Sequence, residues 1–189
     1  MRALLQAGLL TCVAWLVPIL PVAAQPAPLV VTGQVVQPLA LSRAELLALP
    51  RRDYAEQRTV MQDGKEVRLG IAYQGVPLTL LLDRAGLRPD RRDIRKAVVL
   101  LTARDGYQAS FSWGELYNSG IGDGVIVVLR QGTDELLDTD GLPALRSLQD
   151  LRPGPRHVRW LQRIEVLLPS VSQQPQAVGH PVFPQDRSK

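Results

Sequence analysis

Cysteine is almost absent from this sequence. The 189 residues contain one cysteine, Cys12, together with two histidines and 5% aromatic residues. Because Cys12 lies within an apolar N-terminal run that we expect to be cleaved, the mature chain is predicted to contain no cysteine. A chain without cysteine cannot form disulfides, use a thiolate nucleophile or build a cysteine-ligated metal site.

A strong charge of either sign is also missing. Removing Arg2 with the N-terminal run lowers the formal net charge from +4 by one. So mild a charge does not indicate a nucleic-acid partner. The sequence also contains no internal repeat, Gly-rich phosphate loop, HExxH motif or serine nucleophile elbow, which removes the commonest enzyme signatures.

Long apolar runs are limited to the N-terminus, where residues 1–24 have the pattern of a secretory signal peptide. Arg2 precedes an apolar run over 7–20, and small residues lie just before Gln25. A retained membrane anchor is the alternative interpretation, but the run is shorter than the ~20 residues needed to span a bilayer, and Pro18 interrupts it. We therefore expect cleavage and secretion.

The sequence after the signal predicts strands and two short helices. Asp63-Gly64 between alternating segments predicts a hairpin, and Ser42 with Glu45 forms a capping box for the first helix. The expected segments are a strand over 29–36, a helix between Ser42 and Pro50, hairpin strands over 54–62 and 67–73, a helix over 78–85, and strands over 97–103, 107–111 and 125–129.

Less regular segments fill the rest of the chain. They are a turn over 113–117 capped by Ser112, a flexible glycine-containing link over 120–124, a mostly irregular stretch over 131–155, and a final amphipathic stretch over 157–168. Since hairpins dominate and no βαβ alternation occurs, the predicted class is α+β, mainly β, with mixed sheets and short helices. We expect one domain over 25–168 and a disordered tail over 169–189.

Two groups of segments occur in an informative order. The first is Gly75-Val76-Pro77-Leu78, Leu81-Leu82, Ala85-Gly86-Leu87, 98–103, Asp105-Gly106-Tyr107 and Phe111-Ser112; the second is 138–143, Pro153-Gly154, Arg156, Arg159-Trp160 and Ile164-Glu165-Val166. Over roughly residues 29–168 this order resembles the molybdopterin-binding domain of sulfite-oxidase-type oxidoreductases. The resemblance implies that family's fold and a molybdopterin-type ligand.

One departure from the family changes the expected function. Its catalytic members hold molybdenum through a cysteine thiolate, a soft ligand, and the predicted mature chain has none. The chain therefore resembles the small PruR-like branch, periplasmic proteins that bind a reduced pterin and report it to a membrane enzyme of cyclic-di-GMP turnover. This implies a periplasmic location, a tetrahydropterin-type ligand in preference to the molybdenum cofactor, and a membrane signalling partner.

Two alternatives to the pterin-binding interpretation stay open. The chain could be a molybdopterin-dependent oxidoreductase domain that holds its metal without cysteine, or a ligand-free interaction module that docks on a membrane protein. A zinc site is not expected, because His157 and His180 show no short ligand spacing. The absence of cysteine from the predicted mature chain therefore makes an enzyme the less favoured interpretation.

A pterin site needs particular side chains. The ligand is a flat ring whose edge carries donors and a carbonyl, so it calls for an aromatic or guanidinium plane, a carboxylate, and a cationic or amide donor. Candidates occur in two loop regions, the first with Trp113, Glu115, Tyr117 and Asn118, and the second with Asp138, Arg146, Arg156, His157 and Arg159.

Each candidate also has a simpler structural interpretation. Trp113 can fill the core beside Phe111, and a charged loop is usually solvated surface. Arg156 and His157 match the family position that faces the pterin, which favours a binding role for them. Trp160 is assigned to packing.

Overall fold

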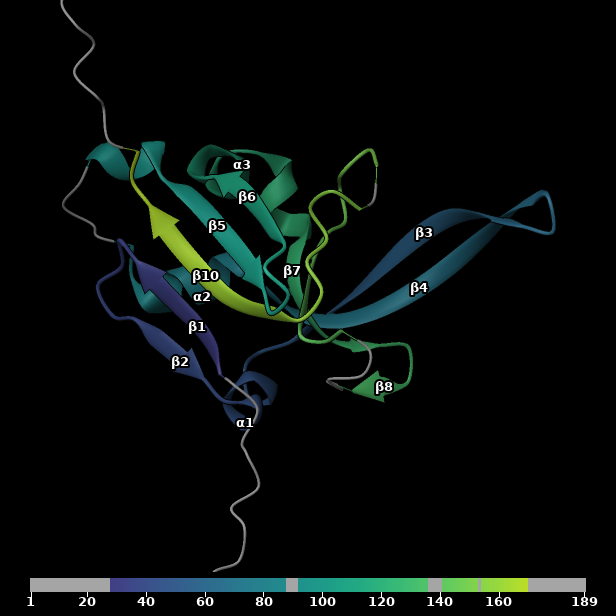
Figure 1. The fold of residues 1–189 in the computed structure, drawn as a ribbon, viewed down its shortest axis with the longest axis horizontal. Coiled ribbons are helices and arrows are strands. Elements are labelled where there is room, and N and C mark those ends of the chain that lie inside the picture. Colours follow the sequence, from purple (N-terminus) through teal and green to yellow (C-terminus); the bar gives the residue numbers. More distant parts are fainter. Residues whose placement is uncertain (1–27, 88–91, 136–140, 153, 170–189) are drawn as a thin grey trace, which may run out of the picture.

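The chain folds as two five-stranded sheets that share one apolar core (Figure 1). The computed structural model describes residues 28–87, 92–135, 141–152 and 154–169. The predicted class, a single mainly-β α+β domain with short helices, is confirmed. The predicted signal peptide, Asp138 and residues 170–189 lie outside the described residues.

The first sheet joins both ends of the domain. Its order is β2-β1-β10-β5-β6, with β1 and β10 parallel and the other neighbours antiparallel. Its strands are β1 (Leu29–Gly33), β2 (Leu39–Leu41), β5 (Val98–Ala103), β6 (Gln108–Ser112) and β10 (Leu161–Leu167). The central position of β10 explains why the last segment of the domain is needed to complete the first sheet.

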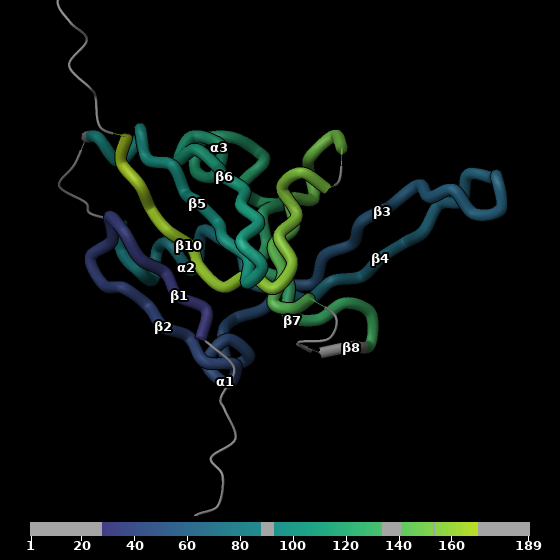
Figure 2. Tube along the Cα trace, in the orientation of Figure 1, coloured from purple at the N-terminus to yellow at the C-terminus, as the bar shows by residue number. Residues whose placement is uncertain are grey.

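The second sheet carries a long hairpin. Its order is β3-β4-β7-β8, and β9 also pairs with β7. Its strands are β3 (Arg52–Gln62), β4 (Lys65–Pro77), β7 (Val125–Gln131), β8 (Asp134–Glu135) and β9 (Ala144–Ser147). The outer part of the β3–β4 hairpin projects away from the body of the domain (Figures 1 and 2).

Short helices cover and connect the sheets. The predicted capping box at Ser42 is confirmed for α1 (Arg43–Leu47), and a second capping box at Ser112 begins α3 (Trp113–Tyr117). In α2 (Leu78–Ala85) the residues at helical spacing are all buried, and they are Leu78, Leu81, Leu82 and Ala85. The first five residues of β7 are also buried, which gives the core its centre.

The described residues of 131–155 are mostly irregular, as the sequence predicts, and contain only the short strands β8 and β9. Two other sequence predictions were wrong in detail. Residues 120–124 are not a flexible link but a 3₁₀ helix, η2 (Gly120–Gly124), while a second one, η1, spans Arg92–Lys96. Trp160 was assigned to packing but lies outside the core, and the guanidinium groups of Arg104 and Arg159 lie 5.4 and 4.6 Å from its ring centroid.

No helix within the described ranges is both long and apolar enough to cross a membrane.

Candidate functional site

The helix α3 separates the residues of the first predicted group. Successive helical residues are rotated by about 100°, so Glu115 points away from Trp113 and Tyr117. The rings of Trp113 and Tyr117 stack with centroids 5.3 Å apart, and both pack against the core. Asn118 is the exposed C-cap residue of the helix. The structure therefore does not bring these four side chains together.

Tyr117 is held on the α2 side of the helix. Its hydroxyl donates to Oδ1 of Asp83 at 2.8 Å. Burial, and then the hydrogen bond to the Asp83 carboxylate, raise the pKa of Tyr117 well above its usual range. Trp113 and Tyr117 thus hold α3 against the body of the domain.

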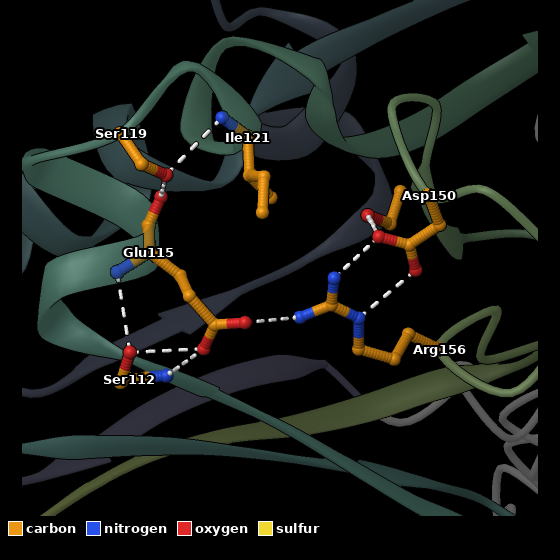
Figure 3. A network of polar contacts seen from close by, with 7 residues as sticks. Ser112, Glu115, Ser119, Ile121, Asp150 and Arg156 are labelled. Atoms are coloured by element: carbon orange, nitrogen blue, oxygen red, sulfur yellow. Dashed lines mark hydrogen bonds and ion pairs between the residues drawn. The ribbon is translucent and has the colours of Figure 1, made fainter.

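Glu115 instead faces Arg156, as Figure 3 shows. The Nη1 of Arg156 donates to Oε1 of Glu115 at 2.6 Å, while its Nε donates to Oδ2 of Asp150 at 2.9 Å. Its Nη2 also donates to Asp150, which completes a bidentate pair. The guanidinium lies 4.3 Å from the ring centroid of Phe111. Carboxylates therefore occupy all three nitrogens of Arg156.

Both carboxylates in this network are held in the ionised form. Partial burial alone raises the pKa of Glu115, but hydrogen bonds from Ser112 and Arg156 outweigh it and leave that pKa below its ordinary value. Burial likewise opposes ionisation of Asp150, and hydrogen bonds from Arg156 and Ser147 lower its pKa. This network is a clamp that joins α3 to the loop after β9.

A second polar cluster lies where the hairpin meets that loop. The Nε of Arg58 donates to Oε1 of Glu56 at 3.0 Å, and the hydroxyl of Tyr73 donates to Oε2 of Glu56 at 2.8 Å. The Nη2 of Arg58 lies 3.3 Å from Nδ1 of His157. We call Glu56, Arg58, Tyr73, Arg146 and His157 the hairpin-base cluster.

The contacts of His157 define its protonation. Arginine can only donate, so Nδ1 of His157 must accept from Arg58. The proton of the neutral ring then lies on Nε2, which is 3.4 Å from the carbonyl oxygen of Ser147. Burial and then the charge of Arg146 lower the pKa of His157. The imidazole is therefore neutral at physiological pH.

Arg146 is the incomplete member of the cluster. Its Nη1 donates to the carbonyl of Leu145 at 3.4 Å, but its Nε is buried and has no hydrogen-bond partner. Its charge reaches both His157 and Tyr73 and lowers the pKa of each, although burial raises that of Tyr73 overall. A buried donor without a partner costs about 1 to 3 kcal/mol, which an acceptor on a bound ligand can recover.

The cluster as a whole has an excess of positive charge. Two arginines face one carboxylate, and the pKa of Glu56 is lowered because hydrogen bonds from Arg58 and Tyr73 outweigh its burial. Such a surplus of donors suits a ligand rich in acceptors.

The remaining residues of the second predicted group lie apart. Arg159 is exposed and its guanidinium lies 4.6 Å from the ring centroid of Trp160, and no hydrogen bond or ion pair joins it to the hairpin-base cluster among the described residues. Asp138 falls outside those residues. Of the predicted group, Arg146 and His157 share one cluster, while Arg156 belongs to the neighbouring clamp.

Sequence reasoning missed the hairpin's contribution. Glu56 and Arg58 are two residues apart on a strand, and the Asp63-Gly64 turn pairs Tyr54 with Tyr73. Those facts put all four side chains on one face of the hairpin. The alternation was thus a usable signal for their grouping, but nothing local indicates that His157, 99 residues from Arg58, joins them.

The donor set fits the organic part of a molybdopterin better than its metal. Arginine and neutral histidine donors suit the pterin carbonyl and a phosphate. The described ranges contain no cysteine and no group of three or more His, Cys, Asp or Glu residues that could hold a metal ion. The described residues thus provide no thiolate for molybdenum. A cysteine thiolate is the ligand that the resemblance to the catalytic family members led us to expect.

Comparison with known proteins supports the fold. The crystal structure of the sulfane dehydrogenase SoxCD from Paracoccus pantotrophus matches with a TM-score of 0.57 and 22% sequence identity, over 80% of this chain and 41% of the SoxCD chain. This chain therefore spans less than half of that relative. No curated protein matches the sequence. Residues 17–174 match the family described as the oxidoreductase molybdopterin binding domain, and the chain belongs to that family.

Proposed function

We propose that this chain binds a reduced pterin at the hairpin-base cluster, as a binding protein and not through a molybdenum centre. The observation that carries the proposal is the buried, unpartnered Nε of Arg146 beside neutral His157. An acceptor on the pterin edge, or on a phosphate attached to it, would satisfy this donor and the positive surplus together. Membership of a molybdopterin-binding family supports a pterin as the ligand.

Ligand released from the purified protein tests this proposal. Protein is purified under reducing, anaerobic conditions and denatured, and the supernatant is oxidised and examined for pterin fluorescence. The proposal expects pterin in near-stoichiometric amount, or uptake of added tetrahydropterin by protein that was purified empty. Absence of both would overturn it.

We further propose that the protein works in the periplasm and reports pterin occupancy to a membrane enzyme of cyclic-di-GMP turnover. The apolar run over 7–20, with small residues before Gln25, supports export. Its test uses the native host. Loss of the gene should change cellular cyclic-di-GMP, with restoration by the wild type and by Arg163→Met, an exposed control, but not by Arg146→Met. Equal restoration by both variants would contradict the link between binding and signalling.

A molybdopterin-dependent oxidoreductase is the second candidate function. It is favoured by the family description, which names oxidoreductases. Elemental analysis of protein made in a molybdenum-replete host separates the two. About one molybdenum per chain would support the oxidoreductase, whereas bound pterin without molybdenum supports the binding protein.

A further inference from the structure

The outer β3–β4 hairpin is a two-stranded ribbon over most of its length. Strand β4 pairs with β7 from Tyr73 to Pro77, and the Ala72 carbonyl accepts a hydrogen bond from Gly132, so β3 is the strand partner of Lys65–Ile71 among the described residues. Both backbone views show this part extending away from the body (Figures 1 and 2). An isolated two-stranded ribbon is at best marginally stable in water. A third strand would stabilise it.

The outer edge of β3 is open to such a strand. β3 ends the order of its sheet, and β4 is its strand partner among the described residues. Natural edge strands are commonly protected by charged side chains, proline, bulges or short length. Arg52–Gln62 contains no proline, lysine or glycine, pairs with β4 without a register shift, and is 11 residues long. Its charged side chains are of both signs, so a strand that places opposite charges across from them can still pair with this edge.

The turn determines which residues face that edge. Asp63 and Gly64 both have positive φ, 52° and 74°, as a two-residue type I′ turn requires. Gln62 and Lys65 flank the turn and form the hydrogen-bonded pair, and such pairs alternate along an antiparallel ribbon. The even-numbered residues of β3 therefore bond to β4. The odd-numbered residues, from Asp53 to Met61, turn their amide and carbonyl groups outward.

We propose that a second copy of this chain adds its own β3 to this edge, antiparallel and centred on Gln57. An antiparallel pair of identical strands is related by a two-fold axis, the commonest symmetry of homodimers. Centring on Gln57 places outward-facing residues opposite one another, Asp53 against Met61 and Ala55 against Thr59. All five outward-facing residues then bond to the other copy.

The side chains are complementary in this register. Glu56 of each copy lies opposite Arg58 of the other, and Tyr54 lies opposite Val60. Opposite charges and aromatic–β-branched pairs are the cross-strand neighbours that stabilise sheets, each by roughly 0.2 to 1 kcal/mol. Neighbouring registers lose this match. Centring on Ala55 places Arg52 against Arg58, and centring on Thr59 places Arg58 against Val60.

The arrangement also keeps the two domains apart. The strands run in opposite directions, so the bodies lie at opposite ends of the shared sheet. Ten residue steps from Arg52 to Gln62 span about 33 Å at roughly 3.3 Å per residue. The face of the hairpin that carries Arg58 also carries the cross-strand apolar pair Val60 and Val67. Leu69 lies beside this pair, and its side chain is 42% exposed. The joint sheet would bring these apolar groups from both copies onto one surface.

Matched proline variants test the proposal by sedimentation of the purified chain. Thr59 and Arg68 are cross-strand partners. Proline at 59 removes an outward amide on the β3 edge, while proline at 68 removes one on the opposite edge, and neither removes a hairpin hydrogen bond. We expect dimers for the wild type and Arg68→Pro and monomers for Thr59→Pro. A monomeric wild type, or equal behaviour of the two variants, would overturn the proposal.

Cross-linking tests the register without breaking any backbone bond. In a Cys12→Ser background, Gln57→Cys places two thiols opposite each other at about 5.5 Å between Cα atoms, within disulfide range. Gln62→Cys places them at opposite ends of the joint sheet. The proposal expects a disulfide-linked dimer on mild oxidation for the first and not for the second. Equal cross-linking of both, or none at 57, would contradict the register.

Discussion

At the level of single residues, Arg146 on β9 and Arg156 in the following loop have different roles. Arg156 has carboxylate partners on all three nitrogens and stacks on Phe111. Arg146 keeps a buried Nε without a partner. Arg156 is therefore suited to joining two parts of the structure, whereas Arg146 retains a donor for a ligand. The two residues are chemically identical, and their hydrogen-bond partners alone give them different roles.

Replacing Arg156 should destabilise the fold. Arg156→Met leaves Asp150 and Glu115 without their shared donor, and the free energy of unfolding should fall by roughly 1 to 3 kcal/mol. Arg159→Met, which removes an exposed guanidinium, should change it by about 0.5 kcal/mol or less. Urea unfolding measures both. Equal losses in the two variants would show that the clamp adds nothing.

The pH dependence of stability should begin at His157. Burial lowers the folded-state pKa of His157 below its ordinary value of 6.5, so the unfolded chain binds the proton more readily. Stability is then complete above that value and falls as pH drops below it. The lowered pKa values of Glu56, Glu115 and Asp150 add a second loss below their ordinary values of 4.5, 4.5 and 3.8.

Denaturant unfolding across pH separates these two steps. His157→Gln should remove the decline that starts near pH 6.5 and leave the acidic decline in place. If stability in His157→Gln still declined from pH 6.5, a group other than His157 would be responsible for that decline.

At the scale of elements, close packing holds η2 against α3. A side chain at Gly122 would place its Cβ 1.9 Å from the carbonyl oxygen of Leu116, which is backbone and cannot move aside. Gly122 is thus needed for a close approach between two helices. The glycines of 120–124, which suggested flexibility in the sequence, instead permit contact.

This contact predicts that alanine destabilises the protein at position 122 but not at position 120. Gly122→Ala should lower the free energy of unfolding by about 3 kcal/mol or more, since overpacking forces the backbone to shift. Gly120→Ala is a matched control, because its Cβ would come no closer than 3.6 Å to Gln149. Thermal unfolding compares them. Similar melting temperatures would contradict the packing account.

Sequence patterns predict the elements whose cause is local. The capping box of Ser42 and Glu45, the Asp63-Gly64 turn and the apolar spacing of α2 each depend on residues a few positions apart, and each is present in the structure. Strand β9 escapes this reasoning because its four residues exist as a strand only through pairing with β7.

The candidate site was predictable only in part, for the same reason. Arg146 and His157 were singled out from the sequence, but their cluster also depends on Arg58 and Glu56 from the distant hairpin. Trp113, proposed as a stacking partner, instead stacks on Tyr117 within its own helix. Contacts between remote segments decide which chemically suitable side chains meet.

At the scale of the whole molecule, the chain is a molybdopterin-binding-family domain that spans less than half of the SoxCD chain. Its described ranges provide arginine, histidine and tyrosine donors but no cysteine. We propose that this donor set binds the pterin without molybdenum.

Calorimetric titration of a tetrahydropterin into the purified, ligand-free protein is the decisive test of this proposal. We expect one site per chain, with affinity lowered at least about tenfold in Arg146→Met, since a charged hydrogen bond contributes roughly 1.5 to 3 kcal/mol. Arg163→Met, an exposed arginine on β10, should bind as the wild type does. No binding by the wild type, or equal affinity in Arg146→Met and the wild type, would show that Arg146 does not form the pterin site.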